Sequence, residues 1–81
     1  MNRTEIMEKL TELCQDIFDN DELEITDATV ASDVKGWDSL TNLQLMSEIE
    51  DEFDITFSLG EVQNFKNVGE LVDSIEKHIA E

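Results

Sequence analysis

The chain has 81 residues, a length that predicts one domain over residues 1–81 with a small core and little room for a walled active site. Asp and Glu number 21 against 5 Lys and Arg, and the formal net charge of -16 argues against nucleic acid or an anionic membrane as partner and favours basic protein surfaces. The one cysteine excludes an internal disulfide, and no stretch reads as a signal peptide or membrane span, so a cytoplasmic monomer is expected.

The first predicted helix covers about residues 3–18. Apolar residues recur there at spacings of four, three and four, which places them on one helical face. They are Ile6, Leu10, Leu13 and Ile17. Cys14 lies beside this stripe, so we interpret it as a small core residue rather than a reactive thiol.

A long loop is predicted over residues 19–36, where the helical periodicity fades. Isolated apolar residues are expected to hold this loop to the core, namely Leu23, Ile25, Val30 and Val34. Ordered loops of this length are uncommon in small domains and often serve a function. The acids near its start lack the spacing of a calcium-binding loop, so no metal site is predicted.

The second predicted helix covers about residues 39–53. Gly36 supplies a tight turn before it, and Asp38 is a favourable N-cap residue. Helical spacing puts Met46, Ile49 and Phe53 on one inward face, flanked by Leu43 and Leu45. Leu40 lies well off that face and is expected to be exposed beside Ser39.

Two further helices complete the predicted fold. A short one is expected over about residues 59–65, because Ser58 and Glu61 have the spacing of a capping box. The last covers about residues 68–79, with Asn67 as its cap and His78 as a solvated residue near its end. The chain is therefore predicted to be all-α, a small four-helix bundle of three main helices plus one short helix, with the long loop between the first and second.

The residues required for ordinary catalysis are missing from this sequence. One histidine stands without a cysteine or acid motif to work with, and no glycine-rich loop has a phosphate-binding pattern. Paired carboxylates with separated pKa values need a buried, shaped site, which a bundle of this size offers poorly. We therefore expect that the protein is not an enzyme and has no catalytic residues.

Ser39 can be interpreted in two ways. Serine is common at a helix start, where it caps the exposed backbone N–H groups. Asp38 can fill that role and leave the Ser39 hydroxyl free, at a helix end that favours a phosphate. Position and composition leave both readings open.

The stretch "GWDSL", from Gly36 to Leu40, resembles the D-S-L motif of acyl carrier proteins of the stand-alone type. The similarity continues through "LTNLQLMSEIEDEFDI" and "FKNVGELVDSIEKHI" and so covers nearly the whole chain. The resemblance implies a 4′-phosphopantetheine arm, derived from coenzyme A and attached to Ser39, that holds acyl cargo as a thioester. It also implies that Asp38 assists metal-dependent attachment by a phosphopantetheinyl transferase.

By the same resemblance, the second helix is the surface that partner enzymes recognise. Its outward residues are Leu40, Thr41, Leu43, Gln44, Ser47, Glu50 and Asp51. The expected partners are acyl-loading, synthase and transferase enzymes with basic docking surfaces, which the charge of -16 would attract. Acids crowd the end of this helix with no basic residue among them, which also indicates a partner that relieves their repulsion.

Some residues depart from the family pattern. Trp37 precedes the motif acid where many carriers have a small or polar residue, and we interpret it as a loop anchor that could also set specificity. Thr41 and Gln44 are neutral where fatty-acid carriers are often acidic, which favours a dedicated pathway in polyketide, lipid or cell-envelope biosynthesis. The alternatives are an aminoacyl or peptidyl carrier on the same arm, and an acidic helical adaptor without covalent cargo.

Overall fold

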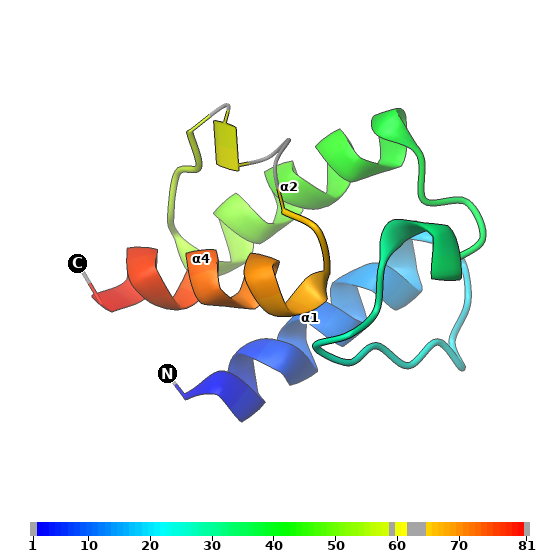
Figure 1. Ribbon diagram of the computed structural model, residues 1–81, viewed down its shortest axis with the longest axis horizontal. Coiled ribbons are helices and arrows are strands. Elements are labelled where there is room, and N and C mark those ends of the chain that lie inside the picture. The colour runs from blue at the N-terminus through cyan, green and yellow to red at the C-terminus, as the bar shows by residue number, and fades with distance from the viewer. Residues whose placement is uncertain (1, 59, 62–64, 81) are drawn as a thin grey trace.

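The protein is all-helical over the residues that the structure, a computed structural model, describes: 2–58, 60–61 and 65–80. Figure 1 shows α1 (Arg3–Ile17), α2 (Ser39–Phe53) and α4 (Val68–Ala80), with the 3-10 turn η1 (Ala31–Asp33) in the long loop between α1 and α2. The three main helices match their predicted ranges to within one residue at each end. The short helix predicted over residues 59–65 falls largely on residues 59 and 62–64, which lie outside the described residues.

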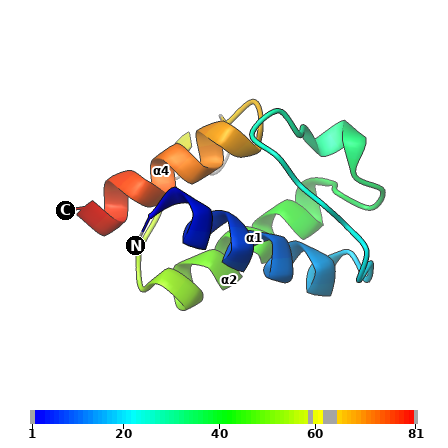
Figure 2. The same cartoon turned by 90° about the horizontal axis from the view of Figure 1, so that it is seen from below.

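The core lies where α1, α2 and α4 meet, and most of its buried side chains are aliphatic (Figures 1 and 2). Each helix contributes the apolar stripe that its spacing indicates. The side chains buried within these helices are Ile6, Leu10, Cys14, Leu45, Met46, Ile49, Val68, Leu71, Val72 and Ile75. Burial of one such Leu or Ile side chain contributes roughly 1.5–3 kcal/mol, so this cluster supplies most of the stability of the fold.

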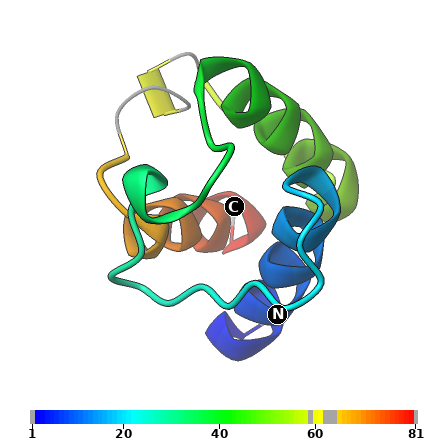
Figure 3. The same cartoon turned by 90° about the vertical axis from the view of Figure 1, so that its right-hand side faces the viewer.

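The long loop is held to the bundle by its own apolar residues. Ile25 and Val34 are buried, and Leu23 packs against the core from one side. Figure 3 shows the loop running from the end of α1 past the start of α4 and on to the start of α2. The loop therefore reaches the starts of both α4 and α2. It covers the start of α4 and leaves the start of α2 exposed.

At the start of α4 the loop closes over the helix end. The backbone N–H of Val68 donates to the Thr29 carbonyl oxygen at 2.8 Å, and that of Gly69 donates to the Asp27 carbonyl oxygen at 2.9 Å. Asn67 caps the next turn by accepting from the backbone N–H of Glu70 at 2.9 Å. These bonds satisfy N–H groups that no carbonyl within the helix can reach.

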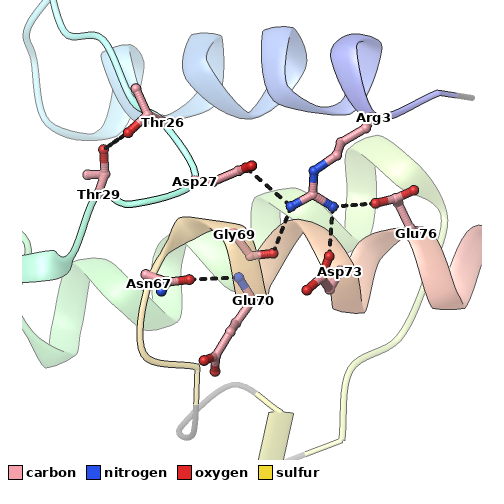
Figure 4. Close-up of polar contacts among 9 residues, drawn as sticks. All are labelled: Arg3, Thr26, Asp27, Thr29, Asn67, Gly69, Glu70, Asp73 and Glu76. Atoms are coloured by element: carbon pink, nitrogen blue, oxygen red, sulfur yellow. Dashed lines mark hydrogen bonds and ion pairs between the residues drawn. The ribbon is translucent and has the colours of Figure 1, made fainter.

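Arg3 fastens this closed end to the start of α1 (Figure 4). Its guanidinium donates to the carboxylates of Asp27, Asp73 and Glu76 and to the carbonyl oxygen of Gly69. Ion pairs to Asp73 and Glu76 raise the pKa of Arg3 above its already high ordinary value. One cation thus offsets three acids from the loop and from α4 in a strongly acidic chain.

His78 is not the solvated residue that the sequence predicts. Its side chain is only 19% exposed, its Nε2 lies 2.7 Å from Oε2 of Glu61, and its ring meets the Phe57 ring edge-on at 5.6 Å. Glu61 in turn forms the predicted capping box with Ser58, which lowers the pKa of Glu61. The prediction was wrong because segments distant in sequence meet at the end of α4.

Candidate functional site

The start of α2 is capped by Asp38, as predicted. Its Oδ1 accepts a hydrogen bond from the backbone N–H of Thr41 at 3.0 Å. Thr41 completes the capping box, because its hydroxyl oxygen accepts from the backbone N–H of Asp38 and donates to the carbonyl oxygen of Gly36, each at 2.8 Å. The bond from the Thr41 N–H lowers the pKa of Asp38, so its carboxylate is ionised at neutral pH.

Ser39 is exposed at the first position of α2, and its cap role is already filled by Asp38. Among the described residues no side chain or backbone group forms a hydrogen bond with its hydroxyl. The sequence left open whether Ser39 caps the helix or keeps a free hydroxyl, and the structure shows that Asp38 is the cap. The Ser39 hydroxyl is available to an outside reagent, while the neighbouring carboxylate of Asp38 already serves the helix end.

Trp37 is the loop anchor that the sequence predicts. Its side chain is 9% exposed, and its ring lies 5.2 Å from the Phe18 ring and 6.3 Å from the Phe65 ring, centroid to centroid. Its indole Nε1–H donates to Oδ1 of Asn42 at 3.0 Å. Gly36, with a φ of 92°, makes the turn that brings the indole inward and leaves Asp38 and Ser39 outside.

A hollow of about 560 Å³ lies directly beside Ser39. It is formed by η1, the end of the loop, the first turns of α2 and the segment before α4. Its lining residues are Ala31, Trp37, Asp38, Ser39, Asn42, Leu43 and Phe65. Sequence reasoning missed Asn42, although its spacing of three from Ser39 places both on one face of a helix. Ala31 and Phe65 come from distant segments and carry no such signal.

The residues predicted to face partners fall into two groups. Five are exposed along α2, with Leu40 at 76% and Leu43 at 56% as the large hydrophobic ones. The exposed set is Leu40, Leu43, Gln44, Ser47 and Asp51. Thr41 and Glu50 are half-buried and bonded internally, Thr41 in the cap and Glu50 through Oε2, which accepts the backbone N–H of Phe57 at 2.8 Å.

Residues 2–58, 60–61 and 65–80 contain neither a cluster of metal ligands nor a helix suited to a membrane. No group of three or more His, Cys, Asp or Glu side chains in these ranges is arranged to hold a metal ion. None of the helices there combines the length and apolar character needed to cross a bilayer.

Comparisons with known proteins point to one family. A family model described as a phosphopantetheine attachment site matches residues 8–75, which is most of the chain. Among solved structures, the holo acyl carrier protein from Geobacter metallireducens, determined by solution NMR, superposes with a TM-score of 0.84 at 39% sequence identity. The match covers 91% of this chain and 85% of that one.

Proposed function

The chain belongs to the acyl carrier protein family, whose members bear a covalent 4′-phosphopantetheine arm, and we propose that in this chain Ser39 carries that arm. Members of the family are carriers rather than catalysts, so the function lies in presenting cargo to other enzymes. The arm acts as a tether that raises the effective concentration of the cargo at each partner's active site.

One observation carries the assignment of Ser39. Its hydroxyl is exposed and has no hydrogen-bond partner among the described residues, because Asp38 performs the cap. Attachment forms a bond from this oxygen to the phosphorus of the arm, while the pyrophosphate bond of coenzyme A breaks. The nucleoside bisphosphate leaves, and the hydroxyl proton passes to a base of the transferase.

Asp38 is proposed to assist the phosphopantetheinyl transferase. Its low pKa keeps it anionic, and it lies next to Ser39 in an exposed position. A carboxylate of this kind suits a divalent cation held between the carrier and the transferase. The same group therefore caps α2 and faces the attachment chemistry.

The exposed residues of α2 are proposed as the surface for acyl-loading, synthase and transferase enzymes. Leu40 and Leu43 supply apolar contacts, and Asp51 lies at the acidic end of the helix. No lysine or arginine occurs between residues 39 and 53, so a basic partner surface meets no repulsion there. Thr41 and Glu50 are proposed to support this surface from within, because both are bonded internally.

The setting is proposed to be a dedicated cytoplasmic pathway of polyketide, lipid or cell-envelope biosynthesis, served by residues 1–81 as a monomeric single domain. Neutral Thr41 and Gln44 on α2 support a partner set different from that of fatty-acid synthesis. An aminoacyl or peptidyl cargo on the same arm is the alternative, and the mass of the loaded protein distinguishes the two.

The test is incubation with coenzyme A and a phosphopantetheinyl transferase, followed by an intact mass measurement. Wild-type protein is expected to gain the mass of one arm, and Ser39→Ala none. Ser32→Ala is the matched control, since it removes an exposed hydroxyl outside the proposed partner surface on α2 and should still be loaded. Mass added to Ser39→Ala would refute the assignment. Protein isolated from its native cell then reports the cargo by its additional mass.

A further inference from the structure

We propose that Thr41 is a positioning residue for attachment of the arm: its side chain fixes the turn that carries Ser39, and so sets where the Ser39 hydroxyl meets the transferase. This inference rests on the proposed attachment to Ser39, and it concerns the attachment step rather than docking. The sequence pattern places Thr41 on the outward face of α2, whereas the structure shows its hydroxyl bonded within the protein.

Thr41 joins the two sides of this turn. Its hydroxyl donates to the carbonyl oxygen of Gly36 and accepts from the backbone N–H of Asp38, each at 2.8 Å. Its backbone N–H donates to Oδ1 of Asp38 at 3.0 Å, so one residue holds both the backbone and the carboxylate of Asp38. The chain is therefore tied down immediately before Ser39, while the Ser39 hydroxyl takes no part in these bonds.

The hydroxyl of Thr41 does more than complete a helix cap. A capping box usually has Glu or Gln at this position, whose side chain accepts from the backbone N–H of the N-cap residue. An ionised carboxylate has no proton to donate, so a glutamate here could not bond the Gly36 carbonyl oxygen. The hydroxyl proton of Thr41 has that oxygen as its nearest acceptor, with two oxygens of Asp38 at 3.2 Å. Thr41 thereby extends the cap back to the turn at Gly36, where φ is 92°.

The attachment step depends on where the Ser39 oxygen lies. This oxygen forms the bond to phosphorus while the pyrophosphate bond of coenzyme A breaks, and its proton passes to a base of the transferase. A misplacement of about 1 Å can slow such a step roughly 100-fold. Ser39 is exposed, and no group among the described residues bonds its hydroxyl, so its position depends on the backbone around it. Thr41 orders that backbone before the transferase binds, which lowers the cost of reaching the reactive geometry.

The experiment measures the steady-state kinetics of arm loading with coenzyme A and a phosphopantetheinyl transferase, followed by intact mass. Thr41→Val removes the hydroxyl with little change of shape, and kcat for loading is expected to fall about tenfold or more. The KM for the carrier should stay within about twofold, because the exposed Leu40 and Leu43 are unchanged. Thr41→Ser keeps the hydroxyl and should restore most of kcat.

Three outcomes would overturn the proposal. They are an unchanged kcat in Thr41→Val, a rise in its KM alone, and a failure of Thr41→Ser to restore kcat. The second would assign Thr41 to docking instead of positioning. A wild-type protein that gains no mass would instead refute the proposed attachment to Ser39, so the two failures are distinguishable.

Two further variants separate positioning from helix stability. Thr11→Val makes the same change in α1, where the hydroxyl donates to the Met7 carbonyl oxygen at 2.7 Å, and it should load as the wild type does. Thr41→Glu supplies an acceptor for the Asp38 N–H but no donor for the Gly36 carbonyl oxygen. Its thermal midpoint is expected to match that of the wild type, with kcat for loading still reduced. If Thr41→Glu loaded at the wild-type kcat, or Thr11→Val loaded as slowly as Thr41→Val, the bond to Gly36 would not be what positions Ser39.

Discussion

The starts of α2 and α4 are built from similar parts and lead to opposite outcomes. Each begins with an Asp or Asn cap, and each is approached by the long loop. At α4 two backbone carbonyl oxygens of the loop accept hydrogen bonds from the helix end, and Arg3 donates to the Gly69 carbonyl oxygen beside them. At α2 the loop turns away at Gly36, so the first residues stay exposed.

The difference shows how one loop separates stability from function. At α4 the backbone N–H groups of Val68 and Gly69 already donate to loop carbonyl oxygens, so these two donors are not available to a ligand. At α2 the side chain of Asp38 caps the helix, so the Ser39 hydroxyl is not used in the cap. Variants at the two ends should therefore alter different properties.

The largest effect is expected from Trp37→Ala, just before the exposed start of α2, which we call the open end. Loss of a buried aromatic ring between Phe18 and Phe65 should reduce the free energy of unfolding by about 3–5 kcal/mol. That is a large part of the roughly 5–15 kcal/mol that stabilises a domain. Urea denaturation measures it, with Trp37→Phe as the milder control. A loss below about 1 kcal/mol would show that the open end does not depend on this ring.

The second largest effect is expected from Gly69→Ala at the start of α4, the closed end, where the loop packs on the helix. An added Cβ would lie 3.0 Å from the Asp27 carbonyl oxygen, which is tighter than an ordinary contact, so the loop backbone must shift away from the start of α4. We expect a loss of about 1–3 kcal/mol in the free energy of unfolding from this overpacking. Alanine ordinarily favours a helix over glycine by about 1 kcal/mol, so a stabilised variant would disprove the close packing. Loading of Ser39 in the folded variant should be unchanged.

A smaller loss of stability is expected from Arg3→Gln. Removal of the guanidinium leaves the carboxylates of Asp73 and Glu76 near one another without a cation. The thermal midpoint should fall at low salt, and the gap to wild type should narrow near 1 M salt, where screening acts within about 3 Å. Lys77→Gln is the control, since it removes the same charge from an exposed lysine outside this cluster. Equal effects of the two variants would mean that only net charge matters.

The smallest change in stability is expected from Asp38→Asn. Asparagine caps a helix about as well as aspartate, so the thermal midpoint of unfolding at neutral pH should be unchanged. Loading by the transferase should nevertheless slow by about tenfold or more, as is typical when a group that supports a metal is lost. Unimpaired loading would leave Asp38 with the cap role alone.

The same variant predicts a change in pH dependence. The pKa of Asp38 is lower in the folded protein than in the unfolded chain. Its contribution is therefore present above the unfolded pKa and is lost as pH falls through the folded value. Asp38→Asn should remove that part of the acid-induced loss of stability, which denaturation at a series of pH values below neutral would detect.

The helices could be predicted from sequence because their signals are local. The stripe through Ile6 and Leu10 and the caps at Asp38 and Asn67 set the helix ranges to within one residue. Asp38 was likewise identified as the cap that releases Ser39, because both act within one turn of helix. Local spacing thus determined the central feature of the candidate site.

Contacts between distant segments could not be predicted in this way. Nothing near Arg3 in sequence indicates its partner Asp73, and nothing near His78 indicates Glu61. The hollow beside Ser39 needs Phe65, which reaches it only after the chain has folded back. These features depend on tertiary packing, and the periodicity of a single helix does not report it.

The burial of Cys14 has a consequence for the cargo. A loaded carrier has two sulfhydryl positions, one at the end of the arm and one in the core. Cys14 is fully buried, and burial raises the pKa of its thiol to about 12, so it stays protonated and out of reach. A thioester on the arm is thereby protected from transfer to a sulfur of its own protein. Alkylating reagents, for the same reason, should label the arm alone.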